Sequence, residues 1–150
     1  MPLFRDERRV RHNAVQMFDL VADVERYPEF VPLCKALKVR SRKLETDGRE
    51  TLVADMTVGY KLIRETFTSR VTLDKPRLKV RVEYIDGPFS HMENIWTFRD
   101  EPRDGRSLVT FFIDYEFRNG ILGSLMGSMF DTAFRKFAQA FEERANALYK

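Results

Sequence analysis

The spacing of apolar residues along this chain changes twice. Close to the N-terminus it fits a helix, from residue 33 to residue 117 about every second residue is apolar, and the last thirty residues fit a helix again. Side chains alternate between the two faces of a strand and return to one face of a helix every 3.6 residues. This order predicts short helices near the start, a long run of strands and one long C-terminal helix.

The N-terminal part predicts a strand followed by two short helices. Residues 3–11 read as a charge-flanked first strand. Asn13 and Gln16 have the three-residue spacing of a capping box, in which each side chain bonds the other residue's backbone N–H. A second helical stretch is expected over residues 24–31, where Pro28 keeps it short because proline lacks a backbone N–H.

The central part alternates strictly between apolar and polar residues, with turn signals at 47–48 and 86–87. Its apolar runs are Leu37 and Val39; Leu52, Ala54, Met56 and Val58; Ile63, Phe67, Val71 and Leu73; Leu78, Val80, Val82 and Tyr84; Met92, Trp96 and Phe98; and Val109, Phe111, Ile113, Tyr115 and Phe117. Alternation of this kind is typical of an antiparallel sheet with one polar face, and no βαβ pattern is present.

Four phenylalanines define one side of the C-terminal helix. At 100° per residue Phe130, Phe134, Phe137 and Phe141 fall within a wedge of about 60°. This wedge must pack on something apolar, and the inner face of the sheet is the only large candidate. We therefore predict an α+β fold forming a single domain over residues 1–150, with a long curved antiparallel sheet, two short helices after the first strand, and a C-terminal helix across the concave face.

Composition excludes several classes of chemistry. The 150 residues include 43% hydrophobic residues, thirteen Phe, one Cys and two His, with a net charge of +3. One cysteine cannot make an intramolecular disulfide or a multi-Cys zinc site, and no nucleotide-binding, zinc-protease or serine-hydrolase motif occurs. The sequence predicts no catalytic constellation, no metal site and no cofactor.

Two polar residues interrupt the apolar faces. Glu65 shares its alternation with Ile63 and Phe67, and Asn94 shares its own with Met92 and Trp96. A buried carboxylate is costly unless it is paired or protonated. Two interpretations of Glu65 are open. In the first, it lies near a strand end, where it pairs with an arginine or occupies a bulge. In the second, Glu65 and Asn94 are among the few polar contacts inside an apolar ligand site.

Three segments resemble a known family: residues 22–34 (ADVERYPEFVPLC), 64–71 (RETFTSRV) and 86–98 (DGPFSHMENIWTF). They are similar to the coenzyme Q-binding START-domain family, which includes the bacterial ribosome association toxin and belongs to the polyketide cyclase/dehydrase group. Leu33 departs from the pattern, because many relatives have Trp there. The resemblance implies a helix-grip fold with a deep internal apolar cavity. It also implies non-enzymatic binding of ubiquinone or a similar polyprenyl lipid in support of respiratory electron transfer.

On this interpretation the ligand-binding residues are expected along the inner faces. They are Phe30, Leu33, Glu65, Phe67, Val80, Val82, Phe89, Asn94, Trp96, Phe98, Phe111, Tyr115, Met126, Phe130, Phe134 and Phe137. The apolar members would hold the polyprenyl tail. The Asn94 amide, the Tyr115 hydroxyl or a protonated Glu65 would donate to a quinone carbonyl.

The start of the C-terminal helix suggests a contact with a membrane surface. Gly123 and Gly127 weaken this part of the helix. Ile121, Leu125 and Met129 point away from the phenylalanine wedge, so they form either an exposed apolar lip that touches the bilayer or a row covered by a loop. We expect a cytoplasmic protein peripheral to the bacterial inner membrane, or one on the matrix side if it is a processed mitochondrial form.

Basic residues concentrate on the outward positions of the strands. They are Lys38, Arg40, Arg42, Arg64, Arg70, Arg77, Lys79 and Arg81. Three interpretations remain open: a solvated face, a contact with anionic lipid, or a contact with the phosphate backbone of the large ribosomal subunit, which the toxin branch of the family implies. Aromatic residues do not interleave with these positions, and DNA is not expected as a partner. A second alternative, a polyketide cyclase or dehydratase, would need an acid/base pair that the sequence does not show.

Overall fold

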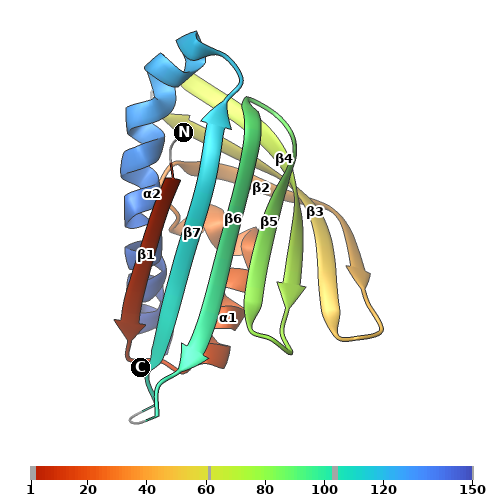
Figure 1. Cartoon of the computed structure of the whole chain (residues 1–150), viewed down its shortest axis with the longest axis vertical. Coiled ribbons are helices and arrows are strands. Elements are labelled where there is room, and N and C mark those ends of the chain that lie inside the picture. The colour runs from red at the N-terminus through yellow and green to blue at the C-terminus, as the bar shows by residue number, and fades with distance from the viewer. Residues whose placement is uncertain (1–2, 61, 103–104, 150) are drawn as a thin grey trace.

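The computed structural model describes residues 3–60, 62–102 and 105–149. Its elements, labelled in Figure 1, are β1 (Leu3–Val10), α1 (Ala14–Ala22), the 3₁₀ helix η1 (Val24–Glu29), β2 (Cys34–Leu44), β3 (Arg49–Tyr60), β4 (Ile63–Asp74), β5 (Lys79–Asp86), β6 (Phe89–Asp100), β7 (Ser107–Phe117) and α2 (Gly120–Leu148).

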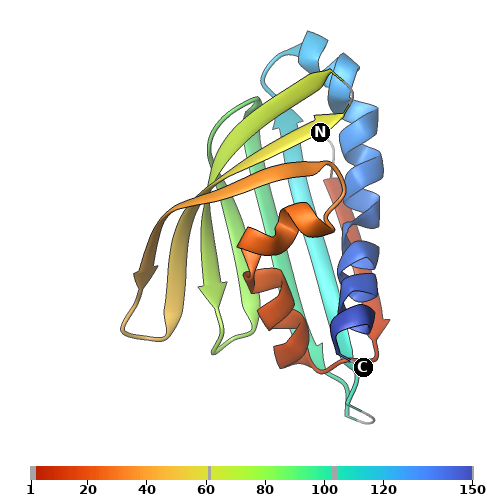
Figure 2. The ribbon, with the colours of Figure 1, turned by 180° about the vertical axis from the view of Figure 1, so that it is seen from behind.

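The strands form one antiparallel sheet in the order β1-β7-β6-β5-β4-β3-β2. Strands β2 to β7 follow one another as a meander, and β1 pairs with β7 from Leu3 opposite Asp114 to Val10 opposite Ser107. Figures 1 and 2 show that the sheet is strongly curved and that α2 lies along its concave side. The predicted fold, a curved antiparallel sheet around a long C-terminal helix, is confirmed.

Irregularities in the strand pairing accompany this curvature. The register shifts between Val39 and Ser41 in β2, between Thr68 and Ser69 where β4 meets β5, and between Phe89 and His91 in β6. A residue inserted into one strand of a pair bends that strand and increases its twist. These shifts let the long strands bend around the helix instead of forming a flat layer.

Helix α2 packs its phenylalanine face onto the sheet. Asn119 caps the helix by accepting a hydrogen bond from the backbone N–H of Leu122 at 2.7 Å. The ring of Phe134 lies 5.0 Å from that of Tyr115 on β7, and the ring of Phe141 lies 4.9 Å from that of Trp96 on β6. The phenylalanine wedge therefore meets the inner face of the sheet, as the sequence predicts.

The two short helices close the lower part of the concave side. Asn13 and Gln16 form the predicted capping box, with N–H···O distances of 2.8 and 3.0 Å. Residues 24–31, predicted to be helical, form a 3₁₀ helix that ends at Glu29, because Phe30 leaves helical geometry with φ −151°. The first strand likewise ends at Val10, one residue before the predicted end.

Replacement of two glycines by alanine should change the stability of the fold in opposite directions. A Cβ at Gly87, where φ is +143°, would lie 2.6 Å from Cβ of Phe67, whereas a Cβ at Gly127 in α2 would meet nothing within 4 Å. Gly87→Ala should lower the free energy of unfolding by about 2 kcal/mol or more through strain and crowding. Gly127→Ala should raise it by about 1 kcal/mol through helix propensity. Urea denaturation of both variants checks this, and equal effects would contradict the placement of Gly87.

Candidate functional site: an apolar cavity under the C-terminal helix

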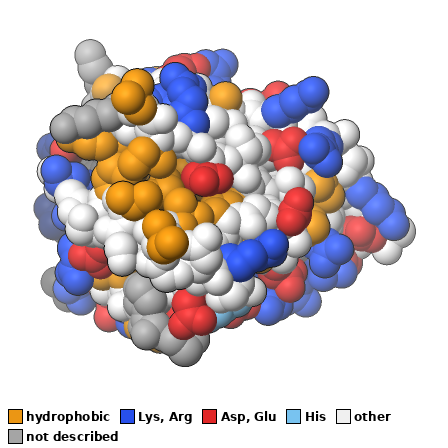
Figure 3. All heavy atoms as spheres, turned by 90° about the horizontal axis from the view of Figure 1, so that it is seen from above, with side chains coloured by type: hydrophobic (Ala, Val, Ile, Leu, Met, Phe, Trp, Pro, Cys, Tyr) orange, Lys and Arg blue, Asp and Glu red, His pale blue; other side chains and the backbone are white. Residues whose placement is uncertain are grey.

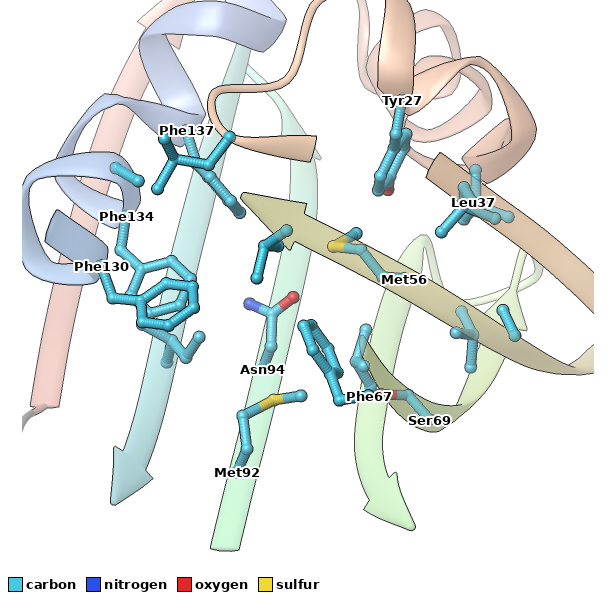
Figure 4. A pocket seen from close by; sticks show the side chains of 18 of the residues that line it. Tyr27, Leu37, Met56, Phe67, Ser69, Met92, Asn94, Phe130, Phe134 and Phe137 are labelled. Atoms are coloured by element: carbon cyan, nitrogen blue, oxygen red, sulfur yellow. The ribbon is translucent and has the colours of Figure 1, made fainter. Parts of the chain in front are cut away.

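A cavity lies between the concave face of the sheet, α2 and the segment from η1 into β2. Its empty volume is about 870 Å³, counting the part that opens to solvent. Figure 4 shows its walls, with Phe130, Phe134 and Phe137 of α2 facing Met56, Phe67 and Met92 of the sheet. Small-molecule sites are typically lined by apolar side chains with a few placed polar groups, and the lining of this cavity fits that description.

Nine of the sixteen residues predicted to bind a ligand line this cavity: Leu33, Phe67, Val82, Phe89, Asn94, Trp96, Phe130, Phe134 and Phe137. They come from the η1–β2 loop, from β4, β5 and β6, and from α2. Residues far apart in the sequence are thus brought to one space by the antiparallel register and by the helix that crosses it.

Five of the remaining predicted residues belong to the packed surroundings and do not line the cavity. Val80, Phe111 and Met126 are at most 1% exposed within the solid core. Phe98 packs edge-on against Phe18 of α1 at 5.9 Å, and Phe30 packs against the ring of Phe141 at 4.9 Å. The three strand residues, Val80, Phe98 and Phe111, share the inward alternation of the cavity residues but lie in the packed core.

Tyr115 is the sixth predicted residue that does not line the cavity. Its side chain is buried and borders a separate groove along α2, beside Gly123 and Asp131. Burial, together with the nearby Asp131 carboxylate, raises the pKa of Tyr115 to about 12. The hydroxyl is therefore protonated at neutral pH, but Tyr115 is not among the residues that line the cavity.

Glu65 is the seventh predicted residue outside the cavity wall. It lies opposite Val58 near the tip of the β3–β4 hairpin and is half-buried. Among the described residues it has neither a hydrogen-bond nor an ion-pair partner. The expected pairing with an arginine is therefore not found, and Glu65 lies on the inner face beyond the cavity.

Among the described lining residues, three side chains carry oxygen. Tyr27 donates to the backbone carbonyl of Val21 at 2.5 Å, and burial strongly raises the pKa of its hydroxyl. The amide nitrogen of Asn94 donates to the backbone carbonyl of Phe112 at 2.8 Å. One of the two amide hydrogens that were predicted to bind a ligand therefore already has a partner within the protein. The hydroxyl of Ser69 has no hydrogen-bond partner although the residue is only 4% exposed.

The sequence analysis missed Ser69, although a signal was present. Ser69 lies between Phe67 and Val71 in the alternation of β4, so it interrupts an inward face as Glu65 and Asn94 do. Ala54 and Met56, also lining residues, were predicted as inward residues of β3 but not as part of a site. Alternation gives the face of a strand, but it does not locate the hollow part of that face.

Leu33 lies at the cavity wall with an unusual backbone. Its φ is +66°, in the left-handed region, and its carbonyl accepts a hydrogen bond from the N–H of Gly59 at 2.9 Å. A residue other than glycine in this conformation costs on the order of 1 kcal/mol. The hydrogen bond from Gly59 of β3 thus holds the Leu33 side chain beside the cavity, although the backbone of Leu33 is strained.

The described residues provide little for reactive chemistry. Burial raises the pKa of the Cys34 thiol to about 11, so it is protonated and a poor nucleophile at neutral pH. Among the described residues no group of three His, Cys, Asp or Glu side chains is placed to hold a metal ion. No described helix is long and apolar enough to cross a bilayer.

The outer face of the sheet carries charges of both signs. Arg40 pairs with Asp55 at 2.6 Å and Arg81 with Glu93 at 2.6 Å. Arg42, predicted to point outward, lies opposite the inward Leu52 because the register of β2 shifts after Val39, and it pairs with Glu25 of η1 at 2.5 Å. Arg77 similarly pairs with Asp74. Half of the basic residues predicted to form a basic face are thus neutralised by neighbouring carboxylates, which makes this face electrostatically mixed.

An apolar patch lies at the end of the molecule where α2 begins. Figures 1 and 2 place the tip of the β3–β4 hairpin beside the first turns of α2, and Figure 3 shows hydrophobic side chains gathered on this end. Leu62 is fully exposed, Ile121 is 76% exposed and Leu125 is 61% exposed. Met129 is half-buried against the core, so only part of the predicted row is open to solvent.

Solved structures share this architecture. The solution structure of an 18 kDa protein from Caulobacter crescentus matches with a TM-score of 0.79 and 30% identity, covering 99% of both chains. The Zhui aromatase/cyclase from Streptomyces sp. R1128 matches with a TM-score of 0.79 over 99% of this chain and 96% of that one, at 17% identity. The fold is that of the START-like and polyketide cyclase proteins.

The family model described as polyketide cyclase / dehydrase and lipid transport matches residues 10–142. The chain therefore belongs to this family. The ribosome association toxin RatA of Rickettsia prowazekii is 29% identical over 98% of both chains. The coenzyme Q-binding protein COQ10 homolog B of Xenopus laevis is 31% identical over 89% of this chain, which spans about half (54%) of that relative's length.

Proposed function

We propose that this protein binds ubiquinone or a related polyprenyl lipid in its cavity and carries it without chemical change. The observation that supports this most directly is the hollow between α2 and the sheet, whose walls are almost entirely hydrocarbon. The description of the family includes lipid transport, and relatives such as COQ10 homolog B are named for coenzyme Q binding. The proposed location is peripheral, at the membrane that holds the lipid.

Burial of the tail suffices for useful affinity. Transfer of a CH₂-sized group from water contributes about 0.8 kcal/mol, so two or three isoprene units outweigh association costs of several kcal/mol. Phe130, Phe134 and Phe137 offer hydrocarbon surface for this purpose. No charged anchor is required.

The chemistry of the lining supports carriage over catalysis. Its described oxygen-bearing side chains belong to Tyr27, Ser69 and Asn94, and no described lining residue is an acid, a histidine, a lysine or a cysteine. Cyclisation or dehydration would need a general acid/base at the ligand. Likeness to the aromatase/cyclase thus extends to the fold, while the proposed activity is binding.

Filling the cavity tests the binding site. Val82 is half-buried on β5 and lines the cavity, so Val82→Phe places a ring in the ligand's space. We expect quinone affinity, measured by titration of intrinsic Trp96 fluorescence with a short-tailed ubiquinone, to fall at least tenfold. Mass spectrometry of organic extracts from the purified protein should show less co-purified polyprenyl lipid than in the wild type.

The matched control is Val53→Phe, the same change on the outer face of β3, opposite Arg70. It should leave quinone affinity unchanged. If Val82→Phe binds quinone as tightly as the wild type and has the same free energy of unfolding, the cavity is not the binding site.

Delivery requires contact with the membrane that holds the lipid. We assign this contact to the apolar patch formed by Leu62, Ile121 and Leu125, beside which Arg64 and Arg118 are exposed. Exposed apolar groups insert into the boundary of the bilayer, and basic residues near them favour anionic lipid. This supports a transient contact at the end of the molecule where α2 begins.

Leu125→Ser should reduce association with liposomes that contain anionic lipid about three- to tenfold, because it removes one inserting side chain. Flotation of the protein with the liposomes measures this, and a quinone transfer assay between liposomes should slow in parallel. The matched control is Leu44→Ser, since Leu44 is at least as exposed, at 74%, but lies at the far end of β2. An equal effect of both changes would contradict the patch.

A second candidate function is association with the ribosome. Relatives that are named ribosome association toxins match nearly the whole length of this chain. The RatA protein of Escherichia coli K12, for example, is 32% identical over 99% of this chain. The exposed side chains of Lys38 and Arg70 on the outer sheet face are candidates for the contact, because the other arginines of that face are largely paired.

The double change Lys38→Glu and Arg70→Glu separates the two functions. If the protein binds the ribosome through this face, co-sedimentation with large subunits should fall more than tenfold and lose part of its salt dependence. Quinone affinity should not change, because both residues lie outside the cavity. Co-sedimentation equal to that of the wild type would exclude this face as the contact.

A further inference from the structure

The sheet wall of the cavity has a hollow where two small side chains face each other. Ala54 of β3 lies directly opposite Ser69 of β4, and the pairs on either side are larger: Leu52 opposite Val71, and Met56 opposite Phe67. Side chains directly opposite on an antiparallel pair lie on the same face, so all of these point to the concave side. Along β3 and β4 the wall is therefore recessed at Ala54 and Ser69, while Tyr84 of β5 lies opposite Ser69 on its other side.

A hydroxyl without a partner lies in this hollow. Ser69 is 4% exposed, and its Oγ makes no hydrogen bond with any described group. Buried polar groups in proteins are nearly always hydrogen-bonded, and an unsatisfied one lowers stability. Alanine, which β3 already has across the pair, would fill the same space without this cost. The stability of the folded chain therefore does not explain why a serine occupies this position, whereas a hydrogen bond to a bound molecule would.

The other two oxygen-bearing side chains of the wall differ in this respect. Tyr27 donates to Val21, and Asn94 donates to Phe112. Asn94 also lies two strands away from Ser69, across β5, where it faces Val82. Figure 4 shows Phe67 between Asn94 and Ser69, so the recess at Ser69 is a distinct part of the wall.

We propose that Ser69 donates a hydrogen bond to an acceptor oxygen on the ring of the bound lipid, and that this bond sets the ring in the recess opposite Ala54. This inference rests on the proposed function and specifies its ligand as an apolar chain that ends in an oxygen-bearing ring. The tail then runs along the phenylalanines of α2, where no oxygen is needed.

The test compares two ligands with the same tail. Decylubiquinone carries ring oxygens, and decylbenzene carries none. In Ser69→Ala we expect the affinity for decylubiquinone to fall about fivefold, since one hydrogen bond is lost, while the affinity for decylbenzene stays within twofold. The same variant without ligand should unfold at a higher temperature than the wild type, because an unsatisfied buried group has been removed.

Two further variants control this test. Ser69→Thr keeps the hydroxyl, so it should retain the preference for decylubiquinone. Ser41→Ala removes an exposed hydroxyl from β2 and should change neither affinity. If Ser69→Ala weakens both ligands equally, or neither, the role of Ser69 is overturned while lipid binding stands. If the wild type binds neither ligand, the proposed function and this inference fail together.

Discussion

One α-helix is too narrow to cover the concave face of a seven-stranded sheet. Neighbouring strands are spaced about 4.8 Å apart, so seven strands span roughly 30 Å, whereas a helix with its side chains is about 10 Å wide. Here α2 packs chiefly on β7 and β1, at one side of the sheet, while η1 packs on β2 at the other. Helix α1 packs on β5, β6 and β7 at one end of these strands. The rest of the middle of the concave face, over β3 to β6, has no element directly on it. The cavity follows from this geometry.

This geometry also explains the composition of the core. A wall that faces an unfilled space cannot rely on close packing, and large rings that contact one another can support it. Phe89 contacts Phe67, Tyr115, Phe117 and Phe130, with ring centroids 5.1–6.0 Å apart. Such aromatic pairs add about 0.5–1.5 kcal/mol each beyond area burial. The phenylalanines of the core thus let the chain keep a hollow interior and a stable fold together.

The fold could be predicted from the sequence because it depends on local signals. The capping box of Asn13 and Gln16, the strand alternation and the phenylalanine wedge each specify an element without knowledge of its partner. The cavity wall was predicted only in part, because Phe67 and Phe98 have the same alternation although one faces empty space and the other packs on α1. The outer face shows the same limit. Arg40 reads as basic in the sequence, but its pairing with Asp55 depends on the register of β2 against β3.

The two faces of this sheet are chemically independent. Alternate residues of one strand point to opposite sides, so a change at Arg70 leaves the part of the cavity wall formed by Ser69 and Val71 unaltered. A family built on this sheet can therefore change its outer surface for a new partner while it keeps the interior, or change the interior while it keeps the surface. This separation gives a physical reason why relatives named for coenzyme Q binding and relatives named for ribosome association both resemble one chain at about 30% identity. It also means that an unsatisfied hydroxyl in the interior, such as that of Ser69, bears on the ligand and not on any partner of the outer face.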